Sequence, residues 1–82
     1  MALETLTITD ANDITIHDIA RQRHMQEGAD LLQTTETLQA AVRAGLNVTA
    51  LREMNTNAIL EVKVDGHPIV DRFADARRAE AA

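Results

Sequence analysis

Three observations predict an α+β fold for this chain of 82 residues. Apolar side chains recur at helical spacing along one stripe of residues 29–44. Residues 60–64 alternate apolar and polar side chains, as a half-buried strand does. Asp65-Gly66 follows directly, and this dipeptide favours a tight hairpin because both central positions of the turn need positive φ. A helix and a hairpin in so short a chain indicate one mixed domain.

The first quarter of the chain predicts a short strand followed by a helix. Residues 6–9 alternate in the manner of a strand, and residues 10–13 have turn composition. Thr15 and Asp18 stand at capping-box spacing, which indicates a helix start. Residues 14–16 could instead form a second strand of an N-terminal hairpin. We favour the helix, running to about Glu27 with a break near Gly28, because Ile16, Ile19 and Ala20 share one helical face.

Gly45 stands where the second helix should end, and it predicts a reversal of the backbone. Small Ala41, four residues earlier, would let two helices approach closely. Asn47 or Thr49 then caps a third helix in this interpretation, and residues 55–57 end it. That helix would direct Val48, Leu51 and Met54 inward. The spacing therefore predicts a helix-turn-helix-like unit.

The last third of the chain predicts the hairpin and a final helix. Leu60, Val62 and Val64 would face the core, and Pro68 limits the returning strand to a short pairing. Asp71 would cap a helix over residues 72–80, with Phe73 and Ala76 facing the body. The predicted whole is a small winged-helix-like domain over residues 1–82: a short N-terminal strand, three helices, a hairpin and a C-terminal helix, with residues 77–82 as a frayed tail.

Composition bears on several classes of function. Cysteine, serine and tyrosine are absent, which excludes disulfides, thiolate metal sites and Ser or Cys nucleophiles. No glycine-rich phosphate loop occurs, so we expect no enzyme activity and no cofactor. His17, His24 and His67 lack a supporting ligand set, and we expect solvated histidines rather than a metal site. Without a signal peptide or a membrane-length apolar run, cytoplasmic residence is the simplest expectation.

The formal net charge of −5 disfavours tight binding to the phosphates of nucleic acid. Residues 1–20 contain four acidic residues and no basic ones. We therefore expect a regulatory or interaction protein that acts through another protein, with a homodimer plausible and no membrane partner. The candidate contact residues are Arg21, Arg23, Met25, Leu46 and Met54. The alternative is a sequence-specific DNA-binding regulator. Its candidate residues are Asn47, Thr49, Arg52, Asn55, Lys63 and His67.

Overall fold

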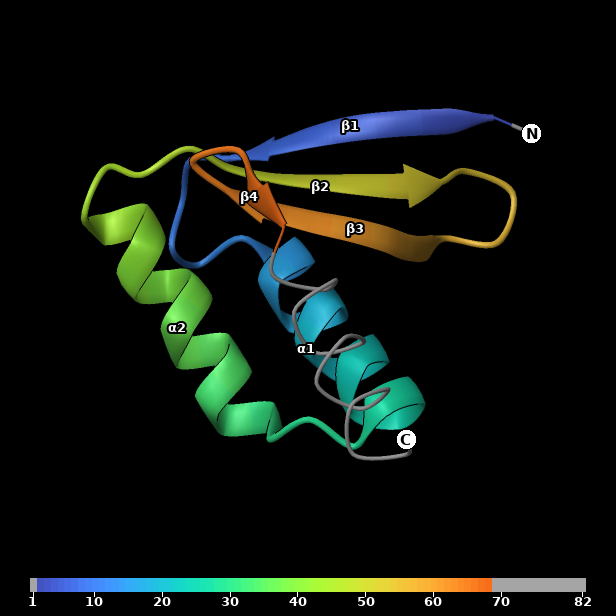
Figure 1. Cartoon of the computed structure of the whole chain (residues 1–82), viewed down its shortest axis with the longest axis horizontal. Helices are drawn as coiled ribbons and strands as arrows, with labels where there is room; N and C mark the ends of the chain where they lie inside the picture. The colour runs from blue at the N-terminus through green and yellow to red at the C-terminus, as the bar shows by residue number, and fades with distance from the viewer. Residues whose placement is uncertain (1, 69–82) are drawn as a thin grey trace.

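A computed structural model describes residues 2–68 as a small α+β domain (Figure 1). The elements are β1 (Leu3–Ile8), α1 (Ile14–Glu27), α2 (Leu31–Arg43), β2 (Val48–Glu53), β3 (Ala58–Val64) and β4 (His67–Pro68). The strands form one antiparallel sheet in the order β1-β2-β3-β4. The predicted α+β class is confirmed, whereas the winged-helix description is not.

The two helices lie side by side and pack on one face of the sheet, α1 against β3 and α2 against β2 (Figure 1). The core between these layers is aliphatic and is contributed by every long element. Its members are Ile8, Ile16, Ile19, Leu38, Ala41, Val48, Ala50 and Val62. Burial of such side chains is the main stabilising term in a domain of this size. Among the described residues, no helix has the length and apolar content that crossing a bilayer requires.

Side-chain caps set the ends of both helices. Asp13 is the N-cap of α1, where its carboxylate accepts from the backbone N–H of Thr15 at 2.9 Å. The cap therefore lies two residues before the predicted Thr15, and the alternative strand at residues 14–16 does not form. Gly28 ends α1 in the left-handed region with φ 70°, which confirms the predicted break. Asp30 then caps α2 through the N–H of Gln33 at 2.7 Å.

The predicted third helix is wrong. Gly45 does turn the chain, with φ 81°, but the segment that follows is strand β2. In this strand Val48 and Ala50 point into the core, while Thr49 and Leu51 point to the other face. Pairing with β1 on one side and β3 on the other satisfies the backbone of β2, so long-range contacts override the local helical spacing. Ala41 packs in the core, and the helix beside α2 is α1 rather than one that follows Gly45.

The predicted hairpin is confirmed, since Asp65 and Gly66 have φ of 52° and 80°. The Asp65 N–H donates to the carbonyl of Asn47, and the Asn47 N–H donates to the Asp65 carboxylate, each at 2.8 Å. The returning strand β4 pairs two residues with β3, Pro68 among them. The predicted final helix with Asp71, Phe73 and Ala76, and the tail at residues 77–82, lie outside the described residues.

One predicted core position in β3 is also wrong. Leu51 pairs with Glu61, whereas the next residue, Arg52, pairs with Ile59. Leu60 is therefore the extra residue of a β-bulge, and its side chain is 44% exposed. The bulge changes the alternation, so Ile59 takes the helix-facing position that the sequence assigns to Leu60.

Candidate interaction surface

The outer edge of β1 is the candidate site, because strand order places β1 at one side of the sheet (Figure 1). The Ala2 carbonyl accepts from the N–H of Met54 at 2.9 Å, which places the hydrogen-bonded pairs at the even-numbered residues of β1. The odd-numbered residues Leu3, Thr5 and Thr7 therefore direct both N–H and C=O away from β2. Nothing within residues 2–68 pairs with these groups.

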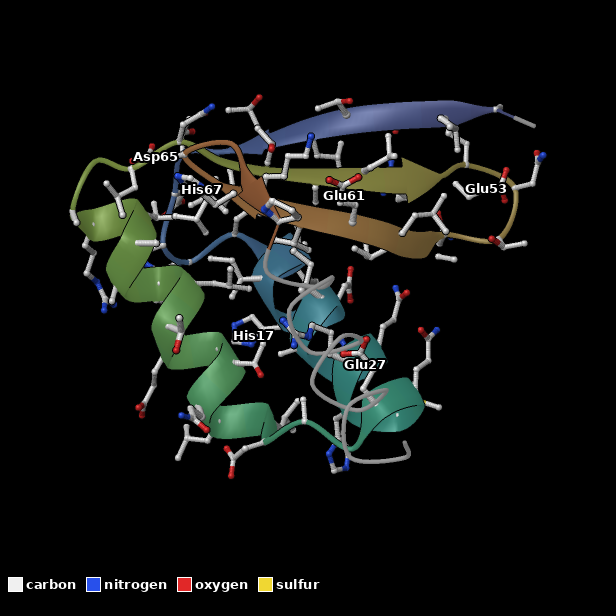
Figure 2. The ribbon with its side chains drawn as sticks, viewed as in Figure 1. His17, Glu27, Glu53, Glu61, Asp65 and His67 are labelled. Carbon is white, nitrogen blue, oxygen red and sulfur yellow. The ribbon has the colours of Figure 1, made fainter. Side chains whose placement is uncertain are left out.

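The same three residues place their side chains on the face of the sheet opposite the helices. All three are exposed, Leu3 to 48%. Beside them lies a shallow depression lined by Thr5, Thr49, Leu51, Glu61 and Lys63. Lys63 Nζ and Glu61 Oε1, both on β3, form an ion pair at its border at 3.3 Å, and Figure 2 labels Glu61 on this strand. The edge thus adjoins a mixed surface of threonine, leucine and paired charges.

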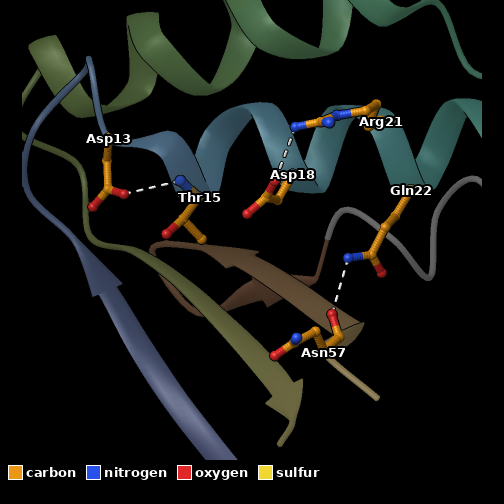
Figure 3. Close-up of polar contacts among 6 residues, drawn as sticks. All are labelled: Asp13, Thr15, Asp18, Arg21, Gln22 and Asn57. Atoms are coloured by element: carbon orange, nitrogen blue, oxygen red, sulfur yellow. Dashed lines mark hydrogen bonds and ion pairs between the residues drawn. The ribbon is translucent and has the colours of Figure 1, made fainter.

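The opposite edge of the sheet is occupied. Strand β4 covers the end of β3 at Lys63 and Val64. Further along, Gln22 reaches from α1, where its Oε1 accepts from the N–H of Ile59 at 2.8 Å. The Gln22 Nε2 donates to the carbonyl of Asn57 at 3.0 Å, the contact drawn in Figure 3. One side-chain amide therefore binds a donor and an acceptor that an additional strand would otherwise bind.

Strand β1 carries only one of the usual devices that block an edge, an inward-facing charge at Glu4, and Arg52 pairs with that charge. Proteins protect exposed edges with proline, lysine, bulges or inward-facing charges. Residues 3–8 contain no proline and no basic residue, and the bulge lies between β2 and β3. The one charged residue, Glu4, belongs to the helix-facing set and pairs with Arg52 Nη2 at 2.6 Å. Among residues 2–68, nothing pairs with the outer edge of β1, and its one inward charge is neutralised by Arg52.

A polar cleft lies between α1 and the far end of the sheet, lined by Thr15, Asp18, Gln22, Arg52, Asn57 and Ile59. Asp18 pairs with Arg21 at 3.0 Å, as Figure 3 shows. Arg52 Nε is buried and has no hydrogen-bond partner within residues 2–68, while its Nη2 binds Glu4. In this cleft Arg52 joins β2 to β1 through Glu4, and Gln22 joins α1 to the edge of β3.

The contact residues predicted on α1 have different environments. Arg21 is exposed beside Asp18, and Met25 is 79% exposed. Arg23, in contrast, is 4% exposed and pairs with Glu27 at 3.3 Å. Burial lowers the pKa of Arg23 from its ordinary value, and the Glu27 carboxylate opposes that shift. Arg23 is a structural residue beneath the helix surface, so its assignment as an exposed anchor is corrected.

The other two predicted contact residues lie at opposite ends of β2. Leu46 is 40% exposed, in the loop before the strand, and Met54 is 52% exposed, directly after it. Leu46 borders an apolar hollow between α2 and the β3–β4 hairpin, with Thr37, Ala40, Ala41, Ala44, Val64 and His67. Six residues of extended chain, about 20 Å, separate the two side chains. The structure does not bring them into one patch.

The residues predicted to read DNA are dispersed by the strand that replaces the helix. Thr49 and Lys63 are register partners on the open face, whereas Arg52 faces the helix layer. Asn47 lies in the loop before β2 and Asn55 in the turn after it. His67 lies on β4. A recognition helix over residues 47–57 is absent, since these residues form β2 and its flanking turns.

The histidines do not come together. His17 and His24 are exposed on α1, and the His24 ring lies 3.0 Å from the carbonyl of Ala29. His67 is exposed on β4, well apart from His17 in Figure 2. In the part of the chain that the structure describes, no three histidine or carboxylate side chains are placed to hold a metal ion.

Sequence reasoning predicted a strand near β1 but not that this strand would be an open edge. The threonine alternation and the lack of proline or lysine were the available signals. Whether β1 lies at an edge depends on strand order. Strand order cannot be predicted when residues 47–57 are assigned to a helix, because β2 is then missing from the sheet. In comparisons with known proteins, no family model, no curated protein and no solved structure matches this chain.

Proposed function

We propose that this chain is a non-enzymatic interaction protein that binds another protein by strand addition to β1. The observation that carries the proposal is the row of outward backbone groups at Leu3, Thr5 and Thr7. An open strand edge is a template for an extended segment, because each added residue pair gains main-chain hydrogen bonds. In this mode the exposed side chains beside the edge select the partner.

The asymmetry between the two edges supports this choice of surface. Gln22 and β4 occupy groups along the edge of β3, whereas nothing described occupies that of β1. The charge of −5 also favours a protein partner over a polyanion, since phosphate binding depends on neutralisation by basic groups. We propose the same regulatory or interaction role that the composition suggests, now carried by the β1 edge rather than by residues 21–25 and 46–54.

The matched variants Thr5→Pro and Thr5→Val test this function. Proline removes the outward N–H, which makes no bond to β2, so the domain should keep its fold. Valine keeps the N–H and suits a strand. We expect quantitative capture from host extract to recover protein, either other chains or further copies of this one, with wild type and Thr5→Val that Thr5→Pro, folded by circular dichroism, does not retain. Equal capture by all three forms would contradict strand addition at β1.

A further inference from the structure

Resting on that proposed function, we infer that the strand added to β1 is β1 of a second copy of this chain. The two copies would pair antiparallel about a two-fold axis through Thr5, perpendicular to the sheet. Closed two-fold symmetry is the commonest arrangement of soluble homo-oligomers, and its interface must be self-complementary. The sequence of β1 meets that requirement in one register better than in its neighbours.

Pleating restricts the registers that are available. Facing residues in an antiparallel pair put their side chains on the same face, so an odd-numbered residue must face an odd-numbered one. The two-fold axis therefore lies between two copies of the same residue, which face each other across the interface. For the strand Leu3–Ile8 the central choices are Glu4, Thr5 and Leu6.

Charge and overlap select Thr5 among these choices. An axis at Glu4 would place two carboxylates directly opposite each other, which is destabilising. An axis at Leu6 leaves Leu3 beyond the overlap. An axis at Thr5 pairs the whole of residues 2–8 and sets Glu4 opposite Leu6 of the second copy. Thr5 then faces its own copy, and Leu3 faces Thr7.

The backbone groups match this register. Leu3, Thr5 and Thr7 are the residues whose N–H and C=O point outward, and they are the residues that form hydrogen-bonded pairs about Thr5. Each such pair exchanges two N–H···O=C bonds, so every outward group of these three residues acquires a partner. An axis at Leu6 would leave the outward groups of Leu3 without one.

The elements described in residues 2–68 leave room for the second copy. The helices pack against β2 and β3, and β1 is the edge strand that lies beyond β2 from β3 (Figure 1). A two-fold axis perpendicular to the sheet keeps both helix layers on one face. The open faces then join into one surface, with Leu3 and Leu51 of each copy close to the junction. The product is a continuous antiparallel sheet across both copies.

A charge-exchange experiment tests the register, because only a residue on the axis faces itself. Thr5→Lys and Thr5→Glu change an exposed side chain, so each variant should fold. We expect sedimentation velocity to show a concentration-dependent dimer for wild type and Thr5→Val. Each charged variant should self-associate more weakly, by up to about fivefold, and an equimolar mixture should regain wild-type association. Thr5→Pro should be a monomer.

The absence of cysteine from the chain gives a second readout. Facing residues of a hydrogen-bonded pair have Cα atoms about 5.5 Å apart, within disulfide range. Thr5→Cys should therefore form a disulfide-linked dimer rapidly under mild oxidation, whereas Thr37→Cys, at an exposed site on α2, should not. Rapid linkage of the Thr5 variant together with mixed-charge rescue supports the dimer.

Two results would overturn the dimer and are distinguishable from failure of the proposed function. A wild-type monomer at all concentrations rejects self-pairing, even if capture of other proteins stays sensitive to Thr5→Pro. A dimer that persists in Thr5→Pro and ignores the charge at position 5 rejects β1 as its interface. Loss of Thr5→Pro sensitivity in both self-association and capture rejects strand addition altogether.

Discussion

The side chain of Gln22 occupies the outer edge of β3, where its Oε1 accepts from the backbone N–H of Ile59 at 2.8 Å. A helix side chain thus forms a hydrogen bond that a neighbouring strand would otherwise form. The Gln22 Nε2 donates a second hydrogen bond, to the carbonyl of Asn57. No side chain performs this role for β1 within residues 2–68. Backbone groups at the outer edge of β3 are therefore hydrogen-bonded, whereas those at the outer edge of β1 are available to a partner strand.

Gln22→Ala should lower the free energy of unfolding by about 1–2 kcal/mol, because the part-buried N–H of Ile59 loses its acceptor. Urea denaturation monitored by circular dichroism measures the change. Gln33→Ala is the matched control, since Gln33 is exposed and its bond to Asp30 uses the backbone N–H. Equal stability of the two variants would show that the Gln22 contacts contribute nothing.

Leu38→Ala should cost about 2–5 kcal/mol of stability, because Leu38 is completely buried between α2 and the sheet. Leu32→Ala on the same helix should change stability by less than about 0.5 kcal/mol, since its side chain is 67% exposed. Thermal and urea unfolding provide the comparison. A similar loss in both variants would contradict the placement of the α2 core stripe.

Glu53 should make stability depend on pH in the acidic range. The N–H of Asn55 and the hydroxyl of Thr56 hold the pKa of Glu53 below its ordinary value, by hydrogen bonds to the carboxylate. A lowered folded-state pKa gives stability that is present above the unfolded-state pKa and lost as pH falls through the folded one. The stability difference between wild type and Glu53→Gln should therefore be largest near neutrality and shrink on acidification. A difference independent of pH would contradict this account.

Short duplex DNA should bind weakly if at all. The chain is acidic, and the segment predicted to enter a groove is a strand between two others. Fluorescence polarisation at about 50 mM salt should show negligible binding with little dependence on ionic strength. Tight binding that weakens steeply with added salt, and is lost in Lys63→Ala, would favour the DNA-binding alternative over a protein partner.

Features fixed by local chemistry were predictable from the sequence. The break at Gly28 and the turn at Gly45 follow from residues that adopt positive φ at little cost. The Asp65-Gly66 hairpin likewise depends on the two residues that form it. Helix α1 ends at Glu27 as predicted, because its end is set by the adjacent glycine.

Features fixed by distant pairing were not predictable in the same way. Val48, Leu51 and Met54 fit helical spacing, and Ala50 is small enough to be read as neutral in either pattern. The β-branched pair Val48-Thr49 was the missed signal for a strand. The segment became a strand because β1 and β3 both pair with it, and no local window contains those contacts.

In the candidate site, too, the features set by local sequence were predictable and those set by distant contacts were not. Alternation in residues 6–9 indicated a strand, but its position at an edge depends on where β2 lies. Arg23 looked like part of an exposed basic patch, yet the helix turns it inward beside Glu27. Gln22, which occupies the other edge, carries no signal in the sequence because its partners lie 35 and 37 residues away.

Site-resolved amide hydrogen exchange across a range of protein concentrations tests the central claim most directly. In dilute protein the N–H groups of Glu4 and Leu6 should be protected by β2, whereas those of Leu3, Thr5 and Thr7 should exchange freely. At high concentration the odd-numbered amides should become protected in wild type, and those of Leu3 and Thr7 should stay unprotected in Thr5→Pro. Free exchange of Leu3, Thr5 and Thr7 at every concentration, with and without captured partners, would contradict a role for the β1 edge in binding.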